Sequence, residues 1–182
     1  MLTHVKDVTI AGIQVKGQEI ALVDRAYWRG HNATSGLVGL AYSLLTSAYI
    51  DDDGALDDGS RVPYSPIVTS MITQGLNPPL FSLSLTRAKS NNGPAGGYLT
   101  FGALPPVAVD PAAFASTPIV PWQYSRDSPA ENLSYYSILP EAYVYNGMNS
   151  INNSTELHAI VDSGAPALYV SITILPAALR SY

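Results

Sequence analysis

The sequence predicts an all-β fold with one or two short helices, and two observations lead to this prediction. Its 14 glycines and 14 prolines divide the 182 residues into short segments. Between these breaks, apolar residues either alternate with polar ones or form short runs, as they do in strands. The length suits one ordinary domain or parts of two.

The first predicted strands lie within residues 5–23, where apolar residues surround Gly12 and Gly17. Two or three short strands joined by tight turns fit this pattern. Residues 36–42 are an apolar run with two glycines, which predicts a buried strand with close backbone contacts. Residues 51–59 are acidic without apolar periodicity, so we expect them to be exposed.

A helix of about two turns is predicted over residues 66–75, because Pro suits a first helical turn and Gly suits a stop. Ile67, Met71 and Ile72 are expected to share its apolar face. The segments 80–85 and 97–102 alternate apolar and polar residues around a turn-rich stretch. This pattern predicts a β-hairpin.

The second half of the chain begins with residues 104–121, which are rich in Pro and Ala and are predicted to be a crossover. Strand character resumes at 135–138 and 143–145, around a turn that contains Pro140. A final strand over 157–161 runs directly into an Asp-Ser-Gly sequence.

The composition excludes several classes of function. Only 13% of residues are charged and the net charge is −5, so no basic block could neutralise nucleic acid or an anionic membrane. The absence of cysteine excludes disulfides, thiolate zinc sites and Cys nucleophiles. No apolar run is long enough to span a bilayer. The first residues do not form a signal peptide, so we expect any targeting segment to be missing from this chain.

Other candidate sites are weak. The histidines His4, His31 and His158 are scattered without a second ligand at metal-like spacing, so neither a metal nor another cofactor is predicted. The acidic segment lacks the alternating ligands of a calcium loop. Four Asn-x-Ser/Thr sequons make glycosylation and secretion plausible, and they begin at Asn32, Asn132, Asn152 and Asn153.

The strongest chemical signal is Asp162, which follows an apolar strand and precedes Ser163 and Gly164. A carboxylate that leaves a β core must be hydrogen-bonded or it will take up a proton. By residue type alone, an Asp-Ser-Gly turn that only closes a strand is the more frequent explanation of this pattern.

Several segments in order resemble the pepsin-like aspartic protease family. Residues 159–164 resemble its apolar-apolar-Asp-Thr/Ser-Gly catalytic loop, and residues 36–42 resemble the Gly-Ile-Leu-Gly-Leu segment beneath the first active-site loop. The segments 73–76, 80–83 and 99–102 resemble its helix end, its Phe-Ser strand and its Gly-x-Leu-x-Phe-Gly strand. The resemblance extends over nearly the whole chain.

This resemblance implies a pepsin-like bilobal fold, present only in part. Residues 1–103 would be the later part of the first lobe, 104–121 the crossover and 122–182 the start of the second lobe. It implies a monomeric, secreted or vacuolar acid endopeptidase that acts on peptide or protein substrates. Asp162 would be one catalytic aspartate, Ser163 would hydrogen-bond across to the opposite loop, and Gly164 would admit the substrate backbone.

The sequence also departs from the family pattern. We expect the first-lobe Asp-Thr-Gly loop and the flap to precede the segment that resembles residues 5–23, so this chain would lack them. The family usually has Thr or Ser after the catalytic Gly, whereas this chain has Ala165 and Pro166. A non-catalytic β-rich binding or structural module, or an inactive protease homologue, therefore remains the alternative.

Overall fold

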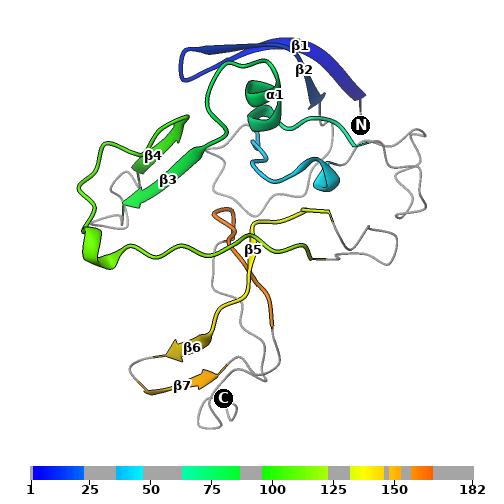
Figure 1. The fold of residues 1–182 in the computed structure, drawn as a ribbon. Coiled ribbons are helices and arrows are strands. Elements are labelled where there is room, and N and C mark those ends of the chain that lie inside the picture. Colours follow the sequence, from blue (N-terminus) through cyan, green and yellow to red (C-terminus); the bar gives the residue numbers. More distant parts are fainter. Residues whose placement is uncertain are drawn as a thin grey trace. The chain divides into compact units, whose positions relative to one another are not determined.

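The computed structural model describes residues 2–22, 36–46, 63–86, 96–122, 132–145, 148–152 and 157–165 (Figure 1). The chain divides into two compact units, Met1–Phe114 and Ala115–Tyr182. Strands predominate in the described ranges, together with one short α-helix and two short 3-10 helices, which confirms the all-β prediction. No helix in these ranges is long and apolar enough to cross a membrane.

The first unit opens with an antiparallel hairpin of β1 (Leu2–Ile10) and β2 (Ile13–Leu22). Its turn uses left-handed backbone at Ala11 and Gly12, with φ of 50° and 80°. The register shifts beside Asp7, whose Oδ1 accepts a hydrogen bond of 3.0 Å from the Gly17 N–H. Two strands are thus confirmed, but Gly17 lies at a bulge inside β2 and not between strands.

Helix α1 (Ile67–Thr73) confirms the helix predicted over 66–75. It follows Pro66 and ends before Gly75, whose φ of 68° stops it. Its buried apolar face contains Ile67 and Met71, one turn apart. The prediction that Ile72 shares this face is wrong, because that side chain is 37% exposed.

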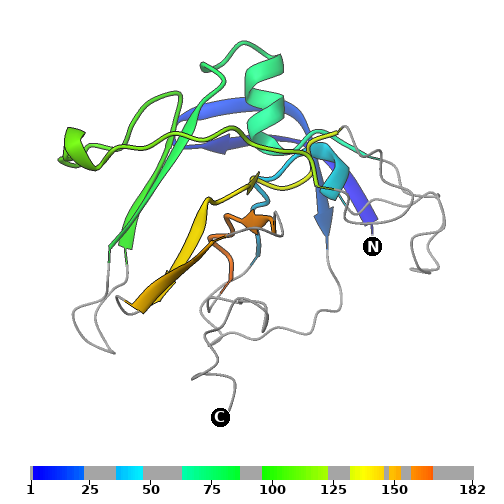
Figure 2. The same cartoon turned by 60° about the horizontal axis from the view of Figure 1, so that its bottom comes forward.

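Two glutamines attach α1 and the residues beside it to β2. Gln74 Oε1 accepts from the Lys16 N–H at 3.1 Å, and Gln74 Nε2 donates to the Lys16 carbonyl at 2.9 Å. Buried Gln18 donates from Nε2 to the Ser65 carbonyl at 2.9 Å. The amide of Gln74 therefore pairs with β2 as a neighbouring strand would, and Figures 1 and 2 both show α1 beside the hairpin.

The core of the first unit lies between this helix and the hairpin. Val15 and Met71 are fully buried there, at 0% exposure each. Ile67 and Val68 complete the buried cluster, and partly buried apolar side chains surround it: Val8, Ile10, Ile13, Leu40, Phe81 and Phe101.

The second hairpin of this unit pairs β3 (Phe81–Thr86) with β4 (Gly96–Phe101) and confirms the predicted hairpin. Its register places Phe81 opposite Phe101, so both aromatic rings reach the core. Gly102 ends β4 with a φ of 72°, and a Cβ there would lie 2.8 Å from Pro78 Cδ. Only glycine fits this position without displacing its neighbour.

The buried strand predicted over residues 36–42 is not observed. These residues are irregular and lead into a 3-10 helix at Ser43–Leu45. Leu37 is 79% exposed and Val38 is 56% exposed. An apolar run becomes a buried strand only if another strand pairs with it, and none of the described strands does so. The acidic segment 51–59 lies outside the described residues.

The second unit contains two short antiparallel pairs. The strand β5 (Ser137–Ile138) pairs with β8 (Ala159–Ile160), and β6 (Ala142–Tyr145) pairs with β7 (Met148–Asn152). The strands β5, β6 and β8 lie where the sequence predicted strand character, although β8 is shorter than the predicted 157–161. The strand β7 was not predicted. Residues 104–121 contain no strand, only the 3-10 helix Pro111–Ala113.

The core predicts unequal effects for two neighbouring helix positions. Met71→Ala should destabilise the chain by about 2–5 kcal/mol, because it leaves a cavity at a fully buried site. Ile72→Ala is the matched control and should cost much less, since Ile72 is 37% exposed. Urea unfolding followed by circular dichroism measures both, and equal losses would contradict the placement of Met71.

Candidate active site

Asp162 lies just beyond the end of β8. The residue before it is still held by the backbone, because the Val161 N–H donates a hydrogen bond of 2.9 Å to the Tyr136 carbonyl. The side chains of Asp162 and Ser163 are both exposed. The strand therefore delivers the carboxylate to the surface of the second unit.

A tight turn fixes the start of this loop. Asp162 Oδ1 accepts a hydrogen bond of 2.8 Å from the Gly164 N–H, which is the geometry of an Asx turn. A Cβ on Gly164 would lie 3.2 Å from that same oxygen, so glycine suits the position. A carboxylate has two oxygens, and this bond uses one. The other can still bind water or a substrate group.

A cluster of polar and aromatic side chains surrounds His158, the residue just before β8. Ser137 Oγ lies 2.9 Å from His158 Nδ1, and Ser137 is fully buried. The His158 ring stacks on Trp122, with centroids 6.1 Å apart. From the sequence no role was predicted for His158, so this cluster was missed. Its members are far apart in the chain, so no local pattern could reveal it.

The predicted glycosylation sites are described only in part. Asn132 is exposed, Asn152 lies in β7, and Asn32 and Asn153 lie outside the described residues. Across the described ranges, no group of three or more His, Cys, Asp or Glu side chains could hold a metal ion.

Two tyrosines in the first unit have shifted acidities. Burial raises the pKa of Tyr42, and burial followed by the Glu19 carboxylate raises the pKa of Tyr64. Both shifts favour the neutral phenol.

Comparison with known proteins gives a consistent result. Residues 3–182 match the family model described as eukaryotic aspartyl protease. A probable aspartic-type endopeptidase of Aspergillus fumigatus is 46% identical over 117 residues, which are 63% of this chain and 24% of that protein. The chain thus spans about a quarter of the length of this relative. No solved structure matches.

The Asx turn predicts different behaviour for two substitutions at position 162. Asp162→Asn keeps an oxygen that can accept from the Gly164 N–H, so the turn should survive without the charge. Asp162→Ala removes the acceptor, and the Gly164 amide should exchange with solvent several-fold faster. Amide exchange followed by NMR measures both variants. Equal exchange in Asp162→Ala and the wild type would contradict the turn.

Proposed function

Because the chain belongs to the eukaryotic aspartyl protease family, we propose that Asp162 is one of two aspartates that activate water to hydrolyse peptide bonds in acid. One observation carries this proposal: an exposed carboxylate, held by a glycine turn directly after a strand, in a chain that matches the family over residues 3–182. The proposed activity is that of an aspartic-type endopeptidase.

The proposed chemistry needs two carboxylates in different protonation states. The ionised one takes a proton from water as the water attacks the scissile carbonyl, and the protonated one polarises that carbonyl. Two neighbouring carboxylates share a proton because ionising both is costly. The reaction requires no metal or cofactor. Ser163 would donate a hydrogen bond across to the opposite loop, and Gly164 would let the substrate backbone approach.

The second carboxylate of the pair would come from outside these 182 residues. The chain has one apolar-apolar-Asp-Ser/Thr-Gly segment, at 160–164. We assign residues 1–103 to the later part of one lobe, 104–121 to the crossover and 122–182 to the start of the other lobe. The division between Phe114 and Ala115 falls within this proposed crossover and supports the assignment.

The proposed partner is a peptide or protein substrate bound by a monomeric enzyme. Nucleic acid is not a proposed partner, because nine Lys and Arg against 14 Asp and Glu leave a net charge of −5. The rival function is a non-catalytic β-rich module. The Asx turn fits this function as well, because the same turn would serve simply to close a strand.

Mutation of Asp162 in the protein expressed from its own gene separates these two functions. Acid hydrolysis of haemoglobin should fall by roughly a hundred- to ten-thousandfold in Asp162→Asn, because a general acid–base group is lost while the turn is kept. Pepstatin should inhibit the wild-type protein. Full activity in Asp162→Asn, or no pepstatin-sensitive activity in the wild type, would favour the rival.

The 182-residue polypeptide alone provides a control in the same assay. It should not cleave haemoglobin at acid pH, since one aspartate cannot act as both base and acid. Robust cleavage that disappears in Asp162→Asn would show that the 182 residues are sufficient, and it would overturn the need for an outside carboxylate.

We also propose that the protein is a secreted or vacuolar glycoprotein, with Asn132 as an occupied sequon. Asn132 is exposed, whereas the sequon hydroxyl, Ser134 Oγ, is buried and donates to the Trp122 carbonyl at 2.9 Å. The transferase that adds the glycan recognises the whole sequon. The glycan should therefore be attached before folding buries Ser134.

A change of sequon tests this modification. When a secretory eukaryotic host expresses the protein, Asn132→Gln should lower its mass by one glycan, and Ser134→Thr should not, because Thr keeps the sequon. Gel mobility before and after glycosidase treatment measures this loss. An unchanged mass in Asn132→Gln would exclude a glycan at this site.

A further inference from the structure

The strand that leads to Asp162 has very little sheet to hold it. Within the part of the chain that the structure describes, the strand β8 pairs with β5 over two residue pairs, Ser137 with Ile160 and Ile138 with Ala159. Isolated two-stranded pairs are marginally stable in water even when longer. Other contacts must therefore fix the backbone of residues 157–161.

Further contacts supply that restraint, and one of them continues the β5–β8 register by one residue pair. Tyr143 Oη donates to the Leu157 carbonyl at 2.9 Å, and the Val161 N–H donates to the Tyr136 carbonyl at 2.9 Å. Between them, His158 Nδ1 and Ser137 Oγ lie 2.9 Å apart. The segment is thus tied at its start, near its middle and at its end.

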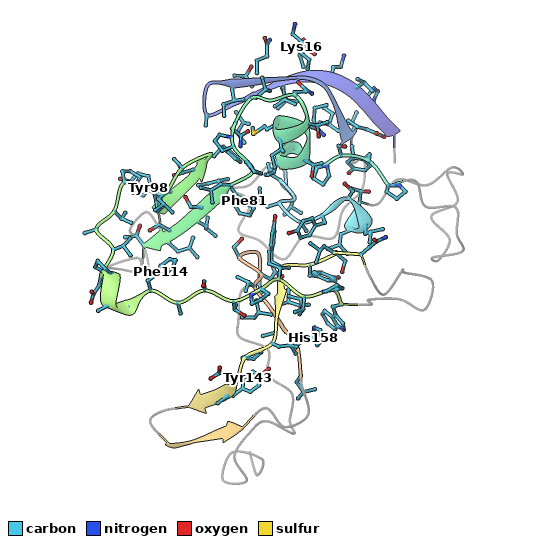
Figure 3. The ribbon with its side chains drawn as sticks, in the orientation of Figure 1. Lys16, Phe81, Tyr98, Phe114, Tyr143 and His158 are labelled. Carbon is cyan, nitrogen blue, oxygen red and sulfur yellow. The ribbon has the colours of Figure 1, made fainter. Side chains whose placement is uncertain are left out.

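The tie through His158 differs from the others because it also involves a ring. The imidazole stacks on Trp122 with an interplanar angle of 28°, and Trp122 in turn lies 5.6 Å from the Tyr135 ring. Ser134 Oγ donates a hydrogen bond of 2.9 Å to the Trp122 carbonyl. The ring face and the Nδ1 edge of His158 are therefore both engaged. Figure 3 shows the side chains of His158 and Tyr143 in the second unit.

A Ser–His pair could also suggest a second nucleophile. Ser137 is 0% exposed, however, so no substrate carbonyl could reach its Oγ. The pair instead joins one strand to the segment that precedes the other.

We propose that His158 is a positioning residue for Asp162, which it holds in place by tying the start of β8 to Ser137 and Trp122. This inference rests on the proposed function only in giving Asp162 a catalytic role. The hydrogen bond to the fully buried Ser137 restrains the backbone at residue 158. Through the short strand β8, this restraint extends to Val161 and the Asx turn. Displacement of a catalytic group by about 1 Å can lower the rate by about a hundredfold.

Amide exchange in the 182-residue chain tests the tie without any protease assay. His158→Phe keeps an aromatic ring for Trp122 but removes Nδ1, so the Val161 and Gly164 amides should exchange roughly five- to tenfold faster. Ser137→Ala should give the same increase, and the double variant should add no further effect. The β1–β2 amides, in the first unit, should not change.

His158→Asn is the rescue variant, because its side-chain amide can reach the Ser137 hydroxyl from the same backbone position. It should restore part of the slow exchange that His158→Phe loses. Wild-type exchange at Val161 and Gly164 in both His158→Phe and Ser137→Ala would overturn the proposal. An equal increase in both units would also overturn it, since it would show a general loss of stability.

The protein expressed from its own gene then connects the tie to catalysis. His158→Phe should lower kcat for acid proteolysis and leave KM nearly unchanged, because His158 acts on Asp162 and not on the substrate. A change in KM alone would overturn the positioning role. Full activity in Asp162→Asn would instead refute the proposed function, and the exchange result would still decide whether the tie exists.

Discussion

The candidate site depends on how a very short strand is held. The strand β8 has two ladder residues, and Asp162 follows after one more residue. Backbone pairing over such a length fixes little. In the proposed arrangement, the hydrogen bond between Ser137 and His158 adds to the order of this segment. Because Ser137 is fully buried, that bond forms away from competing water, where its loss would leave a polar atom without a partner.

In the first unit, glutamine side chains hold another short element, the helix α1, in place. Helix α1 has seven residues, too few to be stable alone, and it gains stability from packing on β2. Gln74 adds two hydrogen bonds to the main chain at Lys16, and Gln18 adds one at Ser65. In both units, side chains distant in sequence replace the ladder bonds that longer elements would make.

The sequence predicted the elements whose signals are local. The helix over 66–75 and the hairpin of 80–102 were found because periodicity, Pro66 and Gly75 act within a few residues. The buried strand over 36–42 was wrong because burial depends on a partner strand, which the run itself does not specify. His158 was missed for a similar reason, because its partner Ser137 lies 21 residues away. Ile72 was predicted to lie on the buried face with Met71, but it is one residue further along the helix and its side chain is 37% exposed.

The position of Asp162 was predictable, whereas its role cannot follow from the loop alone. An Asx turn closed by Gly164 orients the carboxylate and keeps it at the surface, which suits both a simple turn and one half of a catalytic pair. The two roles differ in what faces the second carboxylate oxygen. Water activation needs another carboxyl group close enough to share a proton, since one aspartate cannot accept a proton and donate one at once. In the proposed reaction the chemistry therefore belongs to a pair of aspartates, and the part of this chain is to hold Asp162 in position.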